Sequence, residues 1–274
     1  MRLRAFVKYH GLGNDFVIAR GQAPLEPALV QAICERRLGV GADGVLLSLP
    51  TGRADCAARM LVLNADGSRA QMCGNGLRCF ARYLVEEQGV RETSFKVETD
   101  VGALAVDLVH RPDEETSSVD AHAPWLLRVE LGHGRLGASL DLELGDAQLP
   151  VRCVDLGNPH AVAWLETADP MSEARRIGQQ CSEHPLFPER ANIGFARWRV
   201  AALELVVYER GCGITLACGT GAAAAALVAR ARGFGDAEGL DVLLPGGLLR
   251  VEFGSDGLLR LLGPAVRVFS GEWT

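Results

Sequence analysis

Short runs in which apolar and polar residues alternate recur along the whole chain and predict many β-strands. In the first half, this alternation and β-branched residues, bounded by Gly, Asn or Asp, favour strands over helices. The strands expected there cover 4–10, 60–66, 94–99 and 103–109. The strands expected in the second half cover 126–132, 152–157, 161–166, 203–210, 242–246, 248–253 and 260–263.

Helical periodicity is confined to three stretches, 26–39, 76–89 and 221–233, and each of them ends in glycine. Glycine is the usual residue just after a helix, because it adopts the left-handed conformation there without steric cost. The polar stretch 110–124 is expected to be a linker, and 265–273 has strand character. Together these elements predict an α+β fold.

The chain contains an internal repeat. Cys73-Gly74-x-Gly76 recurs 145 residues later as Cys218-Gly219-x-Gly221, and "LGN" at 12–14 recurs at 156–158. "VETDVGALAVDL" (97–108) lies over "VLLPGGLLRVEF" (242–253) in the same register. Three matches whose offsets agree to within one residue indicate a duplication.

We therefore expect two structurally similar domains. Their expected bounds are 1–118 and 119–263, with a final strand at 264–274 that returns to the first domain.

Composition narrows the class of protein further. The 274 residues are 48% hydrophobic and 23% charged, which is typical of a globular protein with a substantial core. A net charge of −6, with scattered basic residues, argues against a nucleic-acid partner. The N-terminus lacks the apolar run of a secretory signal, and no run is long enough to span a membrane. A cytoplasmic protein is expected.

The eight cysteines are expected to be buried or catalytic thiols rather than disulfides, because the chain is large and has no secretory signal. Cys73/Cys79 and Cys212/Cys218 form two Cys-x5-Cys pairs. Structural zinc sites usually separate paired cysteines by two to four residues. A zinc-stabilised binding module is therefore a remote alternative, and no metal is expected.

The "GVGADG" stretch (39–44) fits a dinucleotide-binding pattern but has the wrong context. That pattern must follow a strand and open a helix. Here a predicted helix precedes the glycines and a strand-like run follows them. We expect a loop without a nucleotide.

Both repeated cysteines precede a predicted helix, where unpaired N–H groups and the positive end of the helix dipole favour an anion. This position lowers a thiol pKa from about 8.5, and glycine lets a ligand carboxylate approach the amides. Two such thiols facing a shared cleft would suit stereoinversion at a carbon: one removes a proton and the other supplies one to the opposite face. A single cysteine beside glycine is more often a small buried residue, but its recurrence favours catalysis. This chemistry needs no cofactor, and the sequence contains no obvious pyridoxal-phosphate site.

Several motifs closely resemble the diaminopimelate epimerase family along almost the whole chain: "HGLGNDF" (10–16), "NADGS" (64–68), "MCGNGLRCFARY" (72–83), "LGNPH" (156–160), "FPERANIGF" (187–195) and "YERGCGITLACGTG" (208–221). The resemblance implies two pseudo-symmetric domains, each a barrel-like, mostly antiparallel sheet around a central helix. It also implies a cofactor-independent isomerase that interconverts LL- and meso-diaminopimelate in lysine and peptidoglycan-precursor synthesis, commonly as a homodimer.

The same resemblance assigns site residues. Cys73 and Cys218 correspond to the acid/base pair, and His160 to a histidine that tunes their protonation. Glu209 is also expected to matter for catalysis. The substrate-binding positions that it implies are Asn14, Asn64, Gly74, Asn75, Asn158, Asn192, Glu209, Arg210, Gly219 and Thr220.

Three positions depart from the family pattern. Gly44 stands where some members carry Gln, and Phe269 stands where members often carry Tyr near an expected dimer contact. Cys212 is an additional thiol with no assigned role.

Two related enzymes are alternatives. A proline or hydroxyproline racemase of the same fold would carry His at Asn75 and would leave Glu209 and Arg210 without a distal amino-acid group to bind. An isomerase related to phenazine synthesis would carry a carboxylate at Cys73. Which cysteine serves which substrate face, and which one is a thiolate at rest, stays open.

Overall fold

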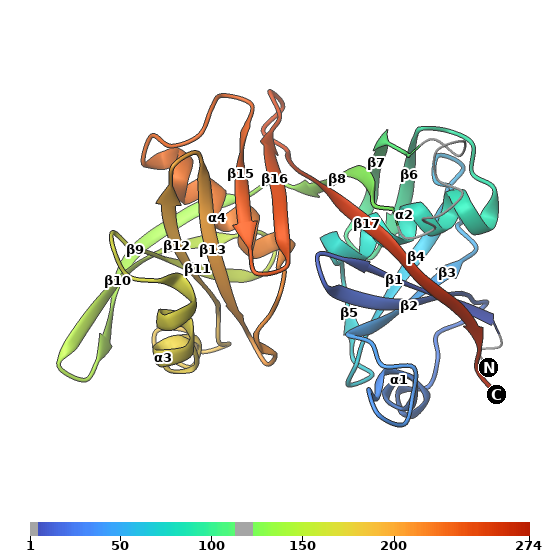
Figure 1. Ribbon diagram of the computed structural model, residues 1–274, viewed down its shortest axis with the longest axis horizontal. Helices are drawn as coiled ribbons and strands as arrows, with labels where there is room; N and C mark the ends of the chain where they lie inside the picture. The colour runs from blue at the N-terminus through green and yellow to red at the C-terminus, as the bar shows by residue number, and fades with distance from the viewer. Residues whose placement is uncertain (1–4, 113–122) are drawn as a thin grey trace. The chain divides into compact units, whose positions relative to one another are not determined.

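The computed structural model describes residues 5–112 and 123–274. The expected domain boundary after 118, and most of the expected linker 110–124, lie outside these residues. The chain divides into two compact units (Figure 1). The first comprises residues 1–130 and 263–274, and the second comprises residues 131–262.

Eight strands of the first unit form a closed ring in the order β17–β1–β2–β3–β4–β6–β7–β8 and back to β17. The β2–β3 and β4–β6 pairs are parallel, whereas the β1–β17, β1–β2, β3–β4, β6–β7 and β7–β8 pairs are antiparallel. A two-residue strand, β5, adds to β4. The bounds are β1 (Ala5–Gly11), β2 (Asn14–Arg20), β3 (Gly44–Leu49), β4 (Ala58–Asn64), β5 (Arg69–Ala70), β6 (Ser94–Thr99), β7 (Gly102–His110), β8 (Trp125–Gly132) and β17 (Leu259–Glu272).

Helix α2 (Gly74–Gln88) is the central helix of the first unit. Its first eleven residues are all buried, on every side of the helix. A helix that is buried all round must be surrounded by other elements. A shorter helix, α1 (Pro27–Cys34), packs against β3 and contributes Val30 and Ile33 to a cluster of buried apolar residues.

The second unit repeats this plan with the strand order β9–β10–β11–β12–β13–β15–β16–β17. Its parallel pairs, β11–β12 and β13–β15, correspond to those of the first unit. Helix α4 (Gly219–Ala231) is buried over most of its length, and α3 (Pro170–Ser182) packs on β12 and β13. The remaining bounds are β9 (Arg135–Leu144), β10 (Ala147–Asp155), β11 (Pro159–Trp164), β12 (Asn192–Arg199), β13 (Ala202–Glu209), β14 (Gly213–Ile214), β15 (Gly239–Leu244) and β16 (Gly247–Phe253).

Backbone geometry supports the duplication seen in the sequence. The β6–β7 hairpin turns between Thr99 and Gly102, and the β15–β16 hairpin turns between Leu244 and Gly247. Gly102 and Gly247 have φ values of 125° and 130°, a conformation that residues with a Cβ rarely adopt. The repeated glycines therefore make the same turn in both units.

The expected helix at 26–39 is wrong in its C-terminal part, because α1 ends at Cys34. The Glu35 carboxylate accepts hydrogen bonds from the backbone N–H groups of Arg37 and Leu38, which replaces helical hydrogen bonding with a local turn. The loop predicted at "GVGADG" is present between α1 and β3, so the order of elements is the reverse of a dinucleotide site.

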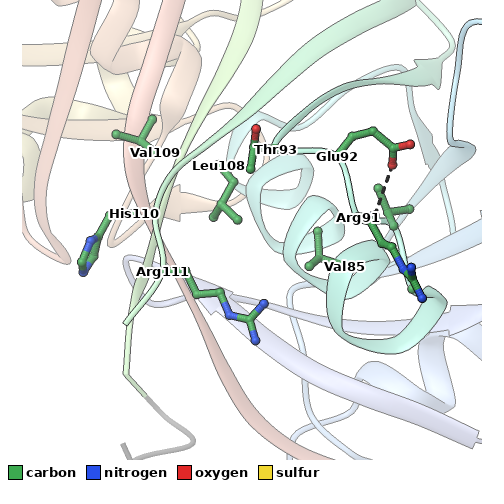
Figure 2. Close-up of a pocket in the computed structure, with 10 residues that line it drawn as sticks. Val85, Arg91, Glu92, Thr93, Leu108, Val109, His110 and Arg111 are labelled. Atoms are coloured by element: carbon green, nitrogen blue, oxygen red, sulfur yellow. Dashed lines mark hydrogen bonds between the residues drawn. The ribbon is translucent and has the colours of Figure 1, made fainter. Parts of the chain in front are cut away.

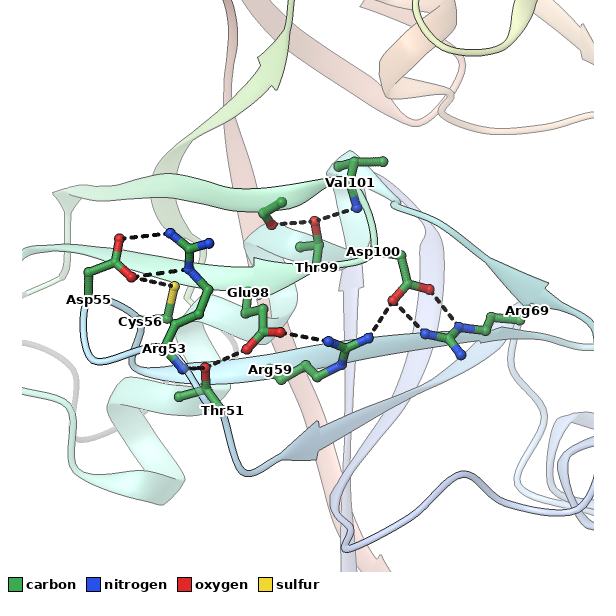
Figure 3. Close-up of polar contacts among 11 residues, drawn as sticks. Thr51, Arg53, Asp55, Cys56, Arg59, Arg69, Glu98, Thr99, Asp100 and Val101 are labelled. Atoms are coloured by element: carbon green, nitrogen blue, oxygen red, sulfur yellow. Dashed lines mark hydrogen bonds and ion pairs between the residues drawn. The ribbon is translucent and has the colours of Figure 1, made fainter.

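Ion pairs connect strand β4 to strand β6 and its neighbouring turn in the first unit. Arg59 on β4 lies 2.6 Å from Glu98 on β6 and 2.8 Å from Asp100, which also pairs with Arg69 (Figure 3). The strands share only a two-residue parallel register there, so these ion pairs reinforce a short ladder. The Glu98 carboxylate also accepts the Thr51 hydroxyl at 2.5 Å.

Candidate active site

Cys73 is the N-cap residue of α2. Its backbone is extended (φ −143°, ψ 116°), and its sulfur accepts the backbone N–H of Gly76 at 3.4 Å. The thiol is half-buried and lies at the end of the helix where unpaired N–H groups favour a negative charge. The sequence-based placement of Cys73 at a helix start is confirmed.

Two asparagines meet at this thiol. Asn75 Nδ2 donates to Asn14 Oδ1 at 3.2 Å, and Asn14 Oδ1 lies 3.9 Å from Cys73 Sγ. Asn14 Nδ2 donates to Asp43 Oδ2 at 2.7 Å. The structure thus brings together three of the expected site residues, Cys73, Asn14 and Asn75. It adds Asp43, which was not predicted from the sequence.

Asn64 ends β4 and is exposed, with its Nδ2 donating to Ser68 Oγ at 2.9 Å. Gly44 is paired with it across the β3–β4 ladder. A Cβ at Gly44 would lie 2.6 Å from the Leu63 carbonyl oxygen, so the close approach of two strands requires glycine here. This packing accounts for one departure from the family pattern.

Cys218 caps α4 in the same manner as Cys73 caps α2. Its φ and ψ are −124° and 108°, and its sulfur accepts the N–H of Gly221 at 3.3 Å. Thr220 Oγ1 lies 3.6 Å from the sulfur and can donate a hydrogen bond to it. A Cβ at Gly221 would approach Val207 Cγ2 to 2.8 Å, so the first helical turn must be free of a side chain there. Both repeated cysteines are therefore N-caps of buried helices.

His160 is buried, and its Nε2 lies 3.1 Å from Asn158 Oδ1. Burial lowers the pKa of His160 to about 4, the charge of Arg210 contributes in the same direction, and Asp155 opposes it. The imidazole is therefore neutral around pH 7.

This buried neutral histidine predicts an acid-sensitive fold. The unfolded state binds a proton near pH 6.5, whereas the folded state does so only near pH 4, so stability is full above pH 6.5 and falls between these values. By a pH of about 4.5, His160 should cost the wild type about 2.5 kcal/mol relative to neutral pH. His160→Gln, which keeps a donor for Asn158, should not show this loss of stability at acid pH. Urea unfolding of both proteins at several pH values measures it, and parallel stability curves would contradict it.

Glu209 and Arg210 follow one another at the end of β13. The Glu209 carboxylate accepts a hydrogen bond from the Thr215 hydroxyl at 2.5 Å.

Arg210 is held by contacts of its backbone and its side chain. Its backbone N–H donates to Asn192 Oδ1 at 2.9 Å, and its guanidinium donates to the Glu189 carbonyl at 3.0 Å. Asn192 Nδ2 donates to a backbone carbonyl at 3.3 Å, so both ends of this amide hold the chain around Arg210. Thr215 is a site contact that the sequence analysis missed, although it lies three residues before Cys218.

The other two departures lie at the surface. Cys212 is exposed. Phe269 is 42% exposed, and its ring meets that of Phe6 edge-on at 6.0 Å between centroids.

No group of three or more His, Cys, Asp or Glu side chains within residues 5–112 and 123–274 is arranged to hold a metal ion. All eight cysteines are free thiols, and Cys79 is fully buried in the core of the first unit. In the same part of the chain, no helix is both long and apolar enough to cross a membrane.

A cavity of about 550 Å³ lies in the first unit between the end of α2 and the end of β7 (Figure 2). It is lined by Val85, Leu108 and other residues of these segments, and Arg111 at its edge packs over the Trp125 ring, 4.9 Å from the centroid. None of the expected site residues lines it.

Solved structures share this fold. A probable proline racemase from Agrobacterium radiobacter matches with a TM-score of 0.75 at 15% identity, over 99% of this chain and 93% of that one. A hydroxyproline epimerase from Agrobacterium vitis matches with a TM-score of 0.72 at 16% identity, over 100% of this chain and 91% of that one. A phenazine biosynthesis protein from Bacillus anthracis gives 0.72 at 17% identity, with both chains fully covered. The fold of this chain is thus shared with structures that include a probable proline racemase and a hydroxyproline epimerase.

Sequence comparison defines the family within this class. The model of the diaminopimelate epimerase family matches residues 6–123 and 152–268. Diaminopimelate epimerase of Synechococcus elongatus is 41% identical over 97% of this chain and 96% of its own length. That of Desulfitobacterium hafniense is 40% identical over the same shares. The chain belongs to the diaminopimelate epimerase family and is an isomerase.

Proposed function

We propose that this chain interconverts LL- and meso-diaminopimelate by proton transfer between the substrate and two thiols. The observation that supports it most is the pair of cysteine N-caps, Cys73 on α2 and Cys218 on α4, each accepting a backbone N–H of the first helical turn. Such hydrogen bonds and the helix dipole stabilise a thiolate. One thiolate removes the α-proton, and the other thiol protonates the opposite face of the same carbon.

The weak acidity of the α-proton is the main barrier to this reaction. Removing it places negative charge on the α-carboxylate, and N–H groups at a helix start stabilise such a charge. We assign this role to the backbone of Gly74 and Asn75 on α2, and of Gly219 and Thr220 on α4. Thr220 also lies close enough to Cys218 to donate to its thiolate.

The distal end of diaminopimelate carries its own ammonium and carboxylate group. Glu209 supplies an anion for the ammonium, and Arg210 supplies a planar cation for the carboxylate. Asn14, Asn64, Asn158 and Asn192 complete the proposed binding set. The contacts of Glu209 with Thr215, and of Arg210 with Asn192 and Glu189, support these roles because they hold the two charged residues in place.

His160 fits a tuning role. A neutral imidazole adds no positive charge near the site, yet it fixes the orientation of Asn158 through their 3.1 Å contact. We further propose that the two compact units are the two equivalent domains of the enzyme. A homodimer, and residence in the cytoplasm, accord with the resemblance to the family.

The purified protein tests this function directly. Incubation with LL-diaminopimelate in D2O should yield meso-diaminopimelate carrying deuterium at the inverted carbon, followed by NMR and chiral chromatography. L-Proline and trans-4-hydroxy-L-proline, incubated in parallel, should not be turned over. Epimerisation of either imino acid without turnover of diaminopimelate would reject the proposal.

A further inference from the structure

The first turns of α2 contain a buried cation that the proposed mechanism does not use. The Arg78 side chain is fully buried, and no ion pair of the described residues includes it. A guanidinium keeps its charge in proteins, and burying it without a carboxylate is unfavourable. The unfavourable free energy of burying this charge without a carboxylate indicates that Arg78 has a function.

The contacts of Arg78 lead toward Cys73. Its Nη2 donates to Asn75 Oδ1 at 2.8 Å, and its Nε donates to the Pro264 carbonyl at 3.3 Å. Nη1 is buried and has no hydrogen-bond partner in the part of the chain that the structure describes. The strand beside it carries Gly11, where a Cβ would lie 3.2 Å from Nη2. A larger residue at this position would crowd the guanidinium.

Charged groups at both ends fix the orientation of the two asparagine amides. Arginine can only donate, so Asn75 must turn Oδ1 toward Arg78, and its Nδ2 then faces Asn14 Oδ1. At the other end, the Asp43 carboxylate can only accept, so Asn14 must turn Nδ2 toward it. The amide orientations therefore follow from chemistry. Together they direct Asn14 Oδ1 toward the Cys73 sulfur.

Of the ionisable groups near Arg78, Cys73 is the one whose protonation its charge can change. The titratable groups that interact with it are the thiols of Cys79 and Cys73. Burial raises the pKa of Cys79 to about 12, so that thiol stays neutral. The thiolate form of Cys73 is left as the anion that this cation favours.

Arg82, one turn further along α2, is the structural contrast. It is also buried, but it pairs with Glu86 at 2.9 Å and donates to the carbonyl groups of Ala123 and Ala265. Its charge is neutralised locally, as is usual for a buried arginine.

We propose that Arg78 is a positioning residue for the Cys73 half of the site. It holds Asn75 and, through Asn75, Asn14, whose Oδ1 accepts from the protonated Cys73 thiol. Its positive charge, which no ion pair of the described residues neutralises, favours the thiolate form. The inference rests on the proposed function, in which Cys73 exchanges a proton with the substrate.

The test compares Arg78→Gln, which keeps an N–H donor without the charge, with Arg78→Lys, which keeps the charge. Iodoacetamide modification of each cysteine is followed at neutral pH by peptide mass spectrometry. In Arg78→Gln, we expect modification of Cys73 to slow about tenfold, because a neighbouring cation favours the reactive thiolate. Modification of Cys218 should not change, and kcat should fall about tenfold with KM within about twofold. Arg78→Lys should restore most of both rates.

Arg82→Gln is the matched control, since it removes a buried guanidinium from the same helix. It should leave the modification of Cys73 unchanged. Equal slowing of Cys73 in Arg82→Gln, equal slowing of Cys218 in Arg78→Gln, or no effect of Arg78→Gln would overturn the inference.

A measurement on the wild-type protein tests the inference even if the Arg78 variants do not fold. In protein labelled with 15N-arginine, the Nε–H resonance of Arg78 should shift when Cys73 is alkylated. It should not shift when Cys73→Ala is treated identically, and an unmoved resonance in the wild type would reject the inference. Alkylation needs no substrate, so its dependence on Arg78 can hold even if diaminopimelate is not turned over, and the two proposals fail separately.

Discussion

Cys73→Ala and Cys218→Ala should each lower the conversion of LL- to meso-diaminopimelate by about 10³-fold or more, because each removes one proton carrier of a two-carrier reaction. Both side chains cap helices that are buried in their units, and alanine lacks only the sulfur. The variants should therefore fold while losing turnover. Conversion is measured by chiral chromatography at saturating substrate.

Isotope exchange separates loss of one proton carrier from loss of binding. A variant with one thiol can still remove the α-proton from one face and return deuterium to the same face. Each single variant should thus exchange one substrate isomer in D2O without epimerising it, and Cys73→Ala and Cys218→Ala should prefer opposite isomers. Cys79→Ala and Cys181→Ala, which alter buried thiols outside the site, serve as controls and should epimerise normally. Near wild-type turnover in either single variant would refute the two-thiol reaction.

Ala224→Leu should destabilise the second unit by about 3 kcal/mol, at the upper end of the usual cost of overpacking. The five consecutive alanines of α4, Ala222–Ala226, are all fully buried, and the helix contacts strands on several sides. A core at crystal-like density cannot accept three additional carbon atoms without displacing its neighbours. Urea unfolding followed by circular dichroism measures the change.

Ala231→Leu is the matched control, because Ala231 is the exposed last residue of the same helix. Leucine has nearly the same helix propensity as alanine, so this variant should unfold within about 0.5 kcal/mol of the wild type. If Ala224→Leu were equally stable, the alanines of α4 would not be closely packed.

The elements predicted best from the sequence are those whose signals are local. Helices α2 and α4 were expected at 76–89 and 221–233, and the structure starts each of them two residues earlier, at its cysteine cap. Helix α3 was missed, although Asp169 caps it and Pro170 opens it, because its buried face consists mostly of small residues and carries one large aliphatic side chain, Ile177. The end of α1 was missed because a single side chain, Glu35, decides it.

The candidate site divides in the same way. Repetition alone singled out Cys73 and Cys218, and motif resemblance supplied the rest of the set. Asp43, Arg78 and Thr215 could not be found from spacing, since nothing local marks a residue whose role is to orient another side chain. Asp43 lies 29 residues from Asn14 and meets it only because β2 and β3 pair in parallel.

The division of β17 bears on how the protein is made. Residues 131–262 form the second unit without interruption, whereas the first unit needs residues 263–274 to complete its ring. The second unit can therefore form from one continuous segment. The ring of the first unit cannot close until residues 263–274 have been made, so its folding depends on contacts between the two ends of the chain.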